Sequence, residues 1–352
     1  MLFLDLRGVN KMINAKDFNA AGDGQKDDTQ ALQAAIDEAA KTGSSVFLDA
    51  GVYMCGKLTM RPNTGLCAEP VWSYRGEHGA VIRLNDPQAT CQIDLTNAFG
   101  ASLNGIFLDG GRLGTGVHGL MLNQPDFSKQ EESFRIERCR ISSYSGNGVH
   151  LMRIWLYSMR SCMISYNAGH GIYSYGWDCF LMDNWLSGNG GAGYYADMTT
   201  DKATFTANRV EWNQLGGFVF KNCDLLNITG NCFDHNFGPA LLFGGDNTEG
   251  AGGGLTITGN IFERNGAAEQ HSDLYCDSHI YIKGQSGISM MGNVFRTGYN
   301  DQREGRLKPS YGIVCGGVKH SVIKGNIFHG GASKEPFVDL GENEGLICGD
   351  NP

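Results

Sequence analysis

Histidine, tyrosine, aspartate and lysine, the residue types that transfer protons in enzymes, recur along one part of the chain. They alternate with apolar residues, so a strand would turn them toward one outer surface. Aromatic rings also stack on sugar faces, and the pattern therefore predicts a carbohydrate-processing site. The candidate catalytic residues are Asp197, Tyr195, Lys221, His170, Tyr173 and His150; the candidate substrate-binding residues are Tyr175, Tyr281, Lys283 and His279.

Two other interpretations of these residues stay open. The aromatic side chains could form an interface between copies of the chain, and Asp197 with Lys221 could be an exposed ion pair that contributes little.

A second set of acidic residues, Glu211, Asp234 and Glu263, follows a repeated asparagine at a constant distance of three residues. On neighbouring parallel strands, such side chains would lie about 4.8 Å apart. Pairs of carboxyl groups about 5–5.5 Å or about 6.5–9.5 Å apart serve retaining and inverting glycosidases. We treat the three as a reserve carboxylate site, which could hold a cation or serve as a glycosidase carboxylate pair. The alternative is that Arg209 and Arg264 neutralise them in a structural role.

A third acidic set falls where strands lead into turns, and Asp is common in turns for structural reasons. Alternatively, some of these residues could line the floor of a groove. The set comprises Asp178, Asp201, Asp224 and Asp246.

The elements that would position these side chains come from an internal repeat of roughly 22–24 residues with insertions, which is typical of a solenoid. Each unit has a small or polar anchor residue, then an apolar residue, then a polar turn. The anchors are Cys139, Cys162, Asn184, Asn208, Asn231, Asn260, Asn293 and Asn326.

A second asparagine recurs five residues after these anchors, and Asn tolerates tight turns and can hydrogen-bond its equivalent in the next coil. The next segment of each unit alternates, with apolar positions that we expect to point inward. The second asparagines are Asn167, Asn189, Asn213, Asn236 and Asn265. The inward positions are Val149, Ile172, Tyr194, Phe218, Leu241, Ile280 and Ile313.

Residues 13–45 differ from the repeat. Asp27 or Asp28 can cap a helix that begins near Thr29 and ends at Gly43. One apolar stripe, Leu32, Ala35, Ile36 and Ala39, would cover the open end of the solenoid. We expect one all-β domain over 1–352, a parallel β-helix with an N-terminal capping α-helix and coils at about 46–345.

The segment DFNAAGDGQKDDTQALQAAIDEA followed by VFLDAGVY resembles the opening of the pectate-lyase-like superfamily, and the repeat extends this resemblance over nearly the whole chain. The resemblance implies a right-handed, single-stranded parallel β-helix with its site in an outer groove. The superfamily includes pectate lyases, polygalacturonases, uronan epimerases, other glycosidases and phage tailspikes. The insertions at about 246–254, 266–278 and 297–310 would form a wall of such a groove.

The segment GHGIYSYG, with His170, resembles the polygalacturonase motif around its histidine. The chain lacks the paired Asp that this family carries one coil earlier, and also its Arg–x–Lys segment. These departures put ordinary polygalacturonase activity in doubt. No run of acidic residues marks a pectate-lyase calcium site either.

Composition limits the partners and the compartment. A net charge of −9 argues against nucleic acid as the main partner. No apolar stretch has the length of a membrane span, and the start, MLFLDLRGVNK, does not fit a signal peptide. The 11 cysteines are irregularly spaced, which favours reduced thiols in a core and a cytoplasmic location.

Three functions fit these observations. The first is a glycoside hydrolase acting on an oligo- or polysaccharide, with Asp197 and another carboxylate as acid and base. The second is a lyase or C5-epimerase acting on uronic-acid sugars, in which Tyr195 or Lys221 removes the proton next to the carboxylate. The third is a non-enzymatic glycan-binding or tailspike-like module. No cofactor is required, although a lyase could use Ca²⁺, and a homo-oligomer is compatible with the aromatic surface.

The cysteine pattern generates a first prediction. Alkylation of the unreduced, unfolded protein should label all 11 thiols in mass spectrometry. Recovery of even two blocked thiols from freshly prepared protein would contradict the expected reduced state.

Overall fold

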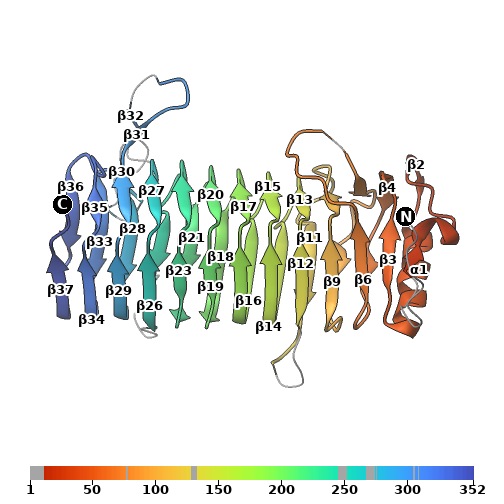
Figure 1. The fold of residues 1–352 in the computed structure, drawn as a ribbon, viewed down its shortest axis with the longest axis horizontal. Helices are drawn as coiled ribbons and strands as arrows, with labels where there is room; N and C mark the ends of the chain where they lie inside the picture. Colours follow the sequence, from red (N-terminus) through yellow and green to blue (C-terminus); the bar gives the residue numbers. More distant parts are fainter. Residues whose placement is uncertain are drawn as a thin grey trace, which may run out of the picture.

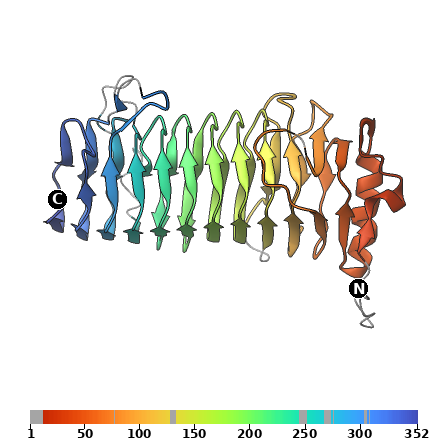
Figure 2. The ribbon, with the colours of Figure 1, turned by 45° about the horizontal axis from the view of Figure 1, so that its top comes forward.

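The computed structural model describes residues 12–76, 78–127, 133–244, 252–266, 274, 276–303, 306–307 and 309–352. The chain winds into an elongated stack of coils, with its two ends at opposite ends of the stack (Figure 1). Each typical coil contributes strands to three columns, and the same columns run along the length of the stack in a second view (Figure 2). The predicted all-β fold of stacked parallel strands is confirmed.

Column 1 holds most of the candidate site residues. Its strands are β5 (Leu58–Thr59), β8 (Cys91–Asp94), β11 (His118–Asn123), the first parts of β14 (Val149–Arg160), β16 (Ile172–Met182) and β18 (Ala192–Asp201), then β21 (Gly216–Phe220), β25 (Leu241–Phe243), β28 (Ser278–Lys283), β33 (Tyr311–Gly316) and β36 (Glu335–Asp339).

Column 2 follows column 1 in each coil. Its strands are β1 (Ile13–Asn14), β3 (Ser45–Leu48), β6 (Gly65–Ala68), β9 (Ala101–Asn104), β12 (Phe134–Glu137), the later parts of β14 and β16, then β19 (Thr204–Thr206), β23 (Asn227–Thr229), β26 (Gly253–Thr258), β29 (Ser286–Met291), β34 (Lys319–Lys324) and β37 (Glu344–Gly349). The short β22 (Cys223–Asp224) pairs with the end of β18.

Column 3 forms a separate sheet. Its strands are β2 (Asp23–Asp27), β4 (Gly51–Cys55), β7 (Ala80–Leu84), β10 (Phe107–Asp109), β13 (Arg140–Ser142), β15 (Met163–Ser165), β17 (Trp185–Ser187), β20 (Arg209–Glu211), β24 (Cys232–Asp234), β27 (Ile261–Glu263), β30 (Val294–Arg296) and β35 (Ile327–Phe328). An antiparallel hairpin, β31 (Gly298–Tyr299) and β32 (Arg306–Leu307), projects beyond it (Figure 1).

Strand alternation fills the interior as the sequence predicts. The register pairs Val149 with Ile172, Ile172 with Tyr194 and Tyr194 with Phe218, and all four side chains are buried. Equivalent phenylalanines of column 3 stack face to face, with ring centroids 5.2 Å apart for Phe233 and Phe262. Because inward residues alternate with outward ones, this packing fixes the direction of the site residues between them.

Asparagine ladders join the coils inside the turns. In the ladder between columns 2 and 3, the Asn208 carboxamide oxygen accepts hydrogen bonds from the backbone N–H and the amide of Asn184, both at 3.0 Å. Its amide nitrogen donates to the Asn231 oxygen at 2.9 Å and to the Leu181 carbonyl at 3.0 Å. Both predicted asparagine columns are confirmed, and the first continues to Asn351.

The N-terminal part has a short 3₁₀ helix, Ala15–Phe18, followed by helix α1, Thr29–Thr42. Helix α1 ends at Gly43, whose φ of 63° is left-handed, and lies at the N-terminal end of the stack (Figure 1). Its stripe of Leu32, Ala35, Ile36 and Ala39 packs into the same core cluster as the coils.

The ladder generates a prediction about stability. Asn208→Ala leaves buried donors of Asn184 without an acceptor, and should lower the free energy of unfolding by about 1–3 kcal/mol. Urea denaturation measures this change. The exposed Asn227, in the neighbouring strand β23, provides the control, because Asn227→Ala should alter stability by less than about 0.5 kcal/mol. Equal effects of the two changes would contradict the role of the ladder.

Candidate functional site

Aromatic side chains on the outer face of column 1 form two short stacks. In the first, the rings of His118 and His150 lie 4.4 Å apart, and those of His150 and Tyr173 lie 4.7 Å apart. In the second, His170 stacks on Tyr195 at 4.2 Å. The stacks adjoin, since the rings of Tyr173 and Tyr195 are 6.0 Å apart. All five side chains are partly exposed, so the stacks form a surface that a flat ligand can contact.

A charged pair lies against these rings. The Lys221 ammonium contacts the Asp197 carboxylate at 2.7 Å, and the Tyr173 hydroxyl donates to the other oxygen of Asp197 at 3.1 Å. Strand β18 bulges after Ala196, which changes its register with β16. The bulge begins at Asp197 and helps to bring its carboxylate to the Tyr173 hydroxyl. The structure therefore brings together all six candidate catalytic residues.

The environment separates the proton affinities of these groups. Burial lowers the pKa of His170 to about 4, although the negative charge of Asp197 acts to raise it. Burial and the nearby Asp197 raise the pKa of Tyr173 to about 12. Hydrogen bonding from Lys221 lowers the pKa of Asp197, and hydrogen bonding to Asp197 raises that of Lys221. At neutral pH the site thus holds neutral imidazoles, a protonated phenol, a carboxylate and an ammonium group.

A second aromatic group continues along the same strands. The Phe127 ring lies 5.1 Å from the ring of Tyr175 and 4.0 Å from that of Trp177, and the Arg153 guanidinium lies 5.8 Å from the Tyr175 ring. Tyr175 is two residues beyond Tyr173 and points outward with it, as its partly exposed position indicates. This group extends the site along the strand direction.

Tyr281 and Lys283 lie farther from the ring stacks. Strand β28, which carries both residues, is three pairing steps from β18, or roughly 14 Å at the usual spacing. The positions between Tyr195 and Tyr281 are the apolar Val219 and Leu242. A ligand would need several sugar units to reach from one group to the other.

The expected outward position of His279 is wrong. Its side chain is fully buried, 5.7 Å from the ring of Phe295, and burial lowers its pKa to about 3. In each coil, the residue just before the first inward residue of the column 1 strand faces the interior of the turn. In most coils this residue is glycine. A Cβ on Gly171, for example, would meet the Asn189 amide at 2.9 Å. The coil that contains β28 accommodates His279 at this position. Simple alternation therefore predicted the wrong direction for the His279 side chain.

The reserve carboxylates lie side by side on successive strands of column 3, as the spacing predicts. This is a different face of the coil from column 1. Each has an arginine partner: Arg209 contacts Glu211 at 2.7 Å, Arg296 contacts Glu263 at 3.3 Å, and Arg264 is paired with Asp234. Although burial opposes it, the adjoining His235 ring and the hydrogen bonds from Arg264 lower the pKa of Asp234. These contacts are the neutralisation expected of a structural column.

The third acidic set has local partners. Asp178, with a left-handed φ of 56°, accepts a hydrogen bond from the Trp155 indole at 2.7 Å. Asp224 accepts one from the Gly253 backbone at 3.0 Å, and Asp201 lies opposite Asp224 in the register. Asp246 lies outside the described residues.

Much of the expected wall also lies outside the described residues, including most of 246–254 and 266–278. The described part of the 297–310 insertion contacts Arg264, whose guanidinium donates to the Tyr299 carbonyl at 2.6 Å. It therefore packs beside the end of column 3.

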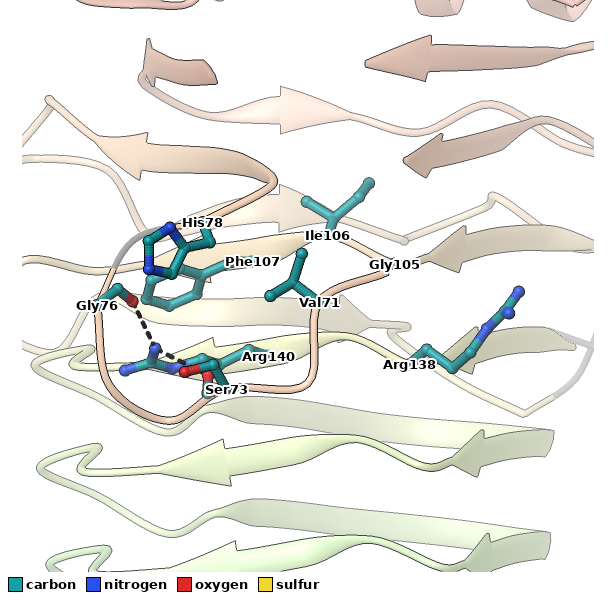
Figure 3. A pocket seen from close by; sticks show the side chains of 9 residues that line it. All are labelled: Val71, Ser73, Gly76, His78, Gly105, Ile106, Phe107, Arg138 and Arg140. Atoms are coloured by element: carbon teal, nitrogen blue, oxygen red, sulfur yellow. Dashed lines mark hydrogen bonds between the residues drawn. The ribbon is translucent and has the colours of Figure 1, made fainter. Parts of the chain in front are cut away.

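A hollow of about 280 Å³, open to solvent, lies beneath the loop before β7 on column 3 (Figure 3). The Arg140 guanidinium lies 4.1 Å from the Phe107 ring and donates to the loop carbonyls of Ser73 and Gly76. Since the arginine fastens the loop, and the ring stacks lie on column 1, this hollow is separate from the candidate site.

No metal centre or membrane-spanning helix is found in the described part of the chain. No group of three or more His, Cys, Asp or Glu side chains there could hold a metal ion. No helix of those residues is long and apolar enough to cross a membrane.

Four aromatic or basic residues near the site were not predicted from the sequence: His118, Arg153, Trp155 and Trp177. A signal for His118 exists, because His118-Gly119-Leu120 repeats the pattern of His170-Gly171-Ile172. The other three depend on the long strands β14 and β16, whose outward faces cannot be paired without knowing where the register shifts.

The lowered histidine pKa values generate a prediction about pH. Between about pH 6.5 and 4 the unfolded chain binds protons that the folded His118, His170 and His279 exclude, so stability should fall as pH falls. Urea denaturation at pH 7, 5.5 and 4 measures the slope, and His279→Leu should reduce it. A free energy of unfolding that stays constant over this range would contradict the buried neutral state.

Comparisons with known proteins agree with the fold. The family model described as "Right handed beta helix region" matches residues 82–262, about half of the chain, and the model described as "Rhamnogalacturonase A/epimerase, pectate lyase-like" matches residues 12–73. Mannuronan C5-epimerase AlgE1 of Azotobacter vinelandii is 36% identical over 152 residues, which are 39% of this chain and 11% of that protein. The chain therefore matches only about a tenth of that relative's length.

Solved structures show the same architecture over nearly the whole chain. The A-module of mannuronan C-5 epimerase AlgE6 of Azotobacter vinelandii has a TM-score of 0.74 at 18% identity and covers 97% of this chain and 100% of its own. The Dettilon tailspike protein gp208 has a TM-score of 0.64 at 14% identity and covers 94% of this chain and 68% of its own. These likenesses concern the fold. With the family matches, they establish that the chain belongs to the pectate-lyase-like superfamily of right-handed parallel β-helix proteins.

Proposed function

We propose that this protein is a C5-epimerase that acts on uronic-acid units of a polysaccharide, with its active site on the outer face of column 1. The observation that carries the proposal is the contact of Tyr173, Asp197 and Lys221 beside partly exposed aromatic rings. The similarity to mannuronan C5-epimerases supports it and suggests mannuronan as the first substrate to test.

Epimerisation begins with removal of the proton on C5, which is acidic only because the adjacent carboxylate can accept the electron pair. Lys221 supplies the positive charge that this step needs. When a sugar carboxylate approaches Lys221, it shares the ammonium with Asp197 and adds a like charge nearby. Both effects raise the pKa of Asp197 and make it a better proton acceptor at the moment of reaction.

The phenol of Tyr173 connects Asp197 to the substrate. Its proton already lies in a hydrogen bond to Asp197. As the C5–H bond breaks, the phenol oxygen takes the C5 proton and passes its own to Asp197, while the electron pair moves into the sugar carboxylate. The Tyr195 hydroxyl, on the neighbouring coil, returns a proton to the opposite face of C5. Transfer between the protonated Asp197 and the Tyr195 phenolate then restores the enzyme.

A lyase is the second candidate, because the same first step followed by loss of the C4 substituent gives an unsaturated sugar. Alginate lyase 7 of Azotobacter vinelandii, 58% identical over 41 residues that are 11% of this chain and 5% of that protein, supports this second candidate. The glycoside hydrolase preferred from sequence has less support. Hydrolysis needs a protonated carboxyl group beside a second carboxylate, whereas the pKa of Asp197 is lowered and the reserve carboxylates face elsewhere.

The reaction is tested by incubating the protein with mannuronan. Proton NMR should show guluronate signals without a change in chain length. Absorbance of unsaturated uronates would favour the lyase, and new reducing ends without unsaturation would favour the hydrolase. Failure to alter mannuronan or a panel of other polyuronates would contradict the proposal.

Variants of the central contact test the assignment of the residues. Tyr173→Phe and Asp197→Asn should each lower kcat about 10²-fold or more, because each removes a proton-transfer group and leaves the coil intact. Tyr166→Phe is the matched control, since Tyr166 is exposed in the turn after column 3. Near-normal turnover of the first two variants, with loss of activity in Glu211→Gln, would place the site on column 3 instead.

A further inference from the structure

In three consecutive coils, the side chain at one position near the start of the column 1 strand bonds the next coil. The position is occupied by His118, Asn147, His170 and Ala192 in successive coils. His118 Nδ1 accepts the backbone N–H of Asn147 at 2.9 Å, and the Asn147 side-chain oxygen accepts that of His170 at 2.8 Å. His170 Nδ1 accepts that of Ala192 at 3.0 Å. These side chains form a ladder of hydrogen-bond acceptors.

The ladder fixes the tautomer of two histidines. A backbone N–H can only donate, so Nδ1 of His118 and of His170 must carry a lone pair. A neutral imidazole has one N–H, which must then be on Nε2. Both side chains are partly exposed, and Nε2 makes no hydrogen bond within the described residues.

His150 is fixed in the same way through an amide. Because the Asn147 oxygen accepts the His170 N–H, its other terminal atom is the NH₂ group. This group lies 3.0 Å from His150 Nδ1 and donates to it. His150 therefore also has its proton on Nε2.

The three rings are held in the neutral state. Burial lowers the pKa of His118 to about 4 and also lowers that of His150, and two charged rings 4.4 Å apart would repel each other. An Nε2 that already bears a proton cannot accept another. A proton could enter the ring only at Nδ1, where the acceptor ladder would have to break.

We propose that His118, His150 and His170 are substrate-binding residues that present a row of neutral Nε2–H donors to the oxygens of an acidic sugar chain, and that none of them is the base of the reaction. This inference rests on the proposed function and identifies how the same site recognises its substrate.

The arrangement suits a uronate polymer. Such a chain offers carboxylate and hydroxyl oxygens at every unit, and N–H groups bind carboxylates more strongly than they bind neutral acceptors. Lys221 supplies the charge at the reacting unit, next to Asp197. The histidines extend the contact over the coils on the N-terminal side, so they hold neighbouring units of the chain without adding further positive charge.

The ladder itself supplies the test variant. Asn147, at the equivalent position in the preceding coil, already accepts the backbone N–H of the next coil with its side-chain oxygen. In His170→Asn, the new asparagine can accept the backbone N–H of Ala192 in the same way. The variant should retain the fold and the hydrogen bond to the next coil, and lose the Nε2–H donor together with the ring that stacks on Tyr195. Isothermal titration with a mannuronate pentamer should show binding about tenfold weaker than that of the unsubstituted protein. His320→Asn, at an exposed position on strand β34, is the control and should bind as the unsubstituted protein does.

Two measurements separate the outcomes. In ¹⁵N-histidine NMR at pH 7, the three rings should show the Nε2–H pattern; an Nδ1–H or doubly protonated ring would overturn the inference. His170→Asn binding equal to that of the unsubstituted protein, or a loss of kcat with unchanged binding, would also overturn it, as would failure of the unsubstituted protein to bind the pentamer. Binding without epimerisation would refute the proposed reaction and leave the donor row intact.

Discussion

Each coil of a parallel β-helix buries polar groups that only the next coil can satisfy, and this requirement governs the whole molecule. Asparagine side chains meet it in the turns, where one amide both accepts from its predecessor and donates to its successor. A buried group without a partner would cost about 1–3 kcal/mol, a large fraction of the stability of a domain. The coils are therefore held in one register, and every outward position has a fixed neighbour.

The candidate site uses the same rule on the outer surface. The ladder of His118, Asn147 and His170 satisfies backbone N–H groups of successive coils and also orients the imidazole rings. Under the proposed function, stability and substrate recognition depend on the same hydrogen bonds. A rigid surface of this kind binds a ligand without first paying to order its own side chains, which favours affinity. The Tyr173–Asp197–Lys221 contact adds groups of different proton affinity on this support.

The sequence predicted those features that depend on repetition. The asparagine columns and the inward alternation follow from the spacing of the repeat, and helix α1 follows from its apolar stripe and the glycine at its end. His150, Tyr173 and Tyr195 converge because alternation holds within their strands, whereas His170 and Lys221 flank strands and Asp197 begins the bulge of β18. His279 was misplaced because its position precedes the regular strand and faces a turn interior that glycine fills elsewhere. Arg153 and Trp177 were missed because the register of β14, β16 and β18 shifts where these strands are long. Such shifts arise from packing between coils and leave no periodic mark in the sequence.

The central claim is that chemistry takes place on the outer face of column 1. A crystal structure of the Tyr173→Phe variant with a bound mannuronate oligomer tests it most directly. We predict a sugar chain that crosses successive coils of column 1, with one carboxylate at Lys221 and the C5 carbon of that unit beside the ring at position 173. An oligomer bound along Glu211 and Asp234 on column 3, or in the hollow beside Arg140, would contradict the account.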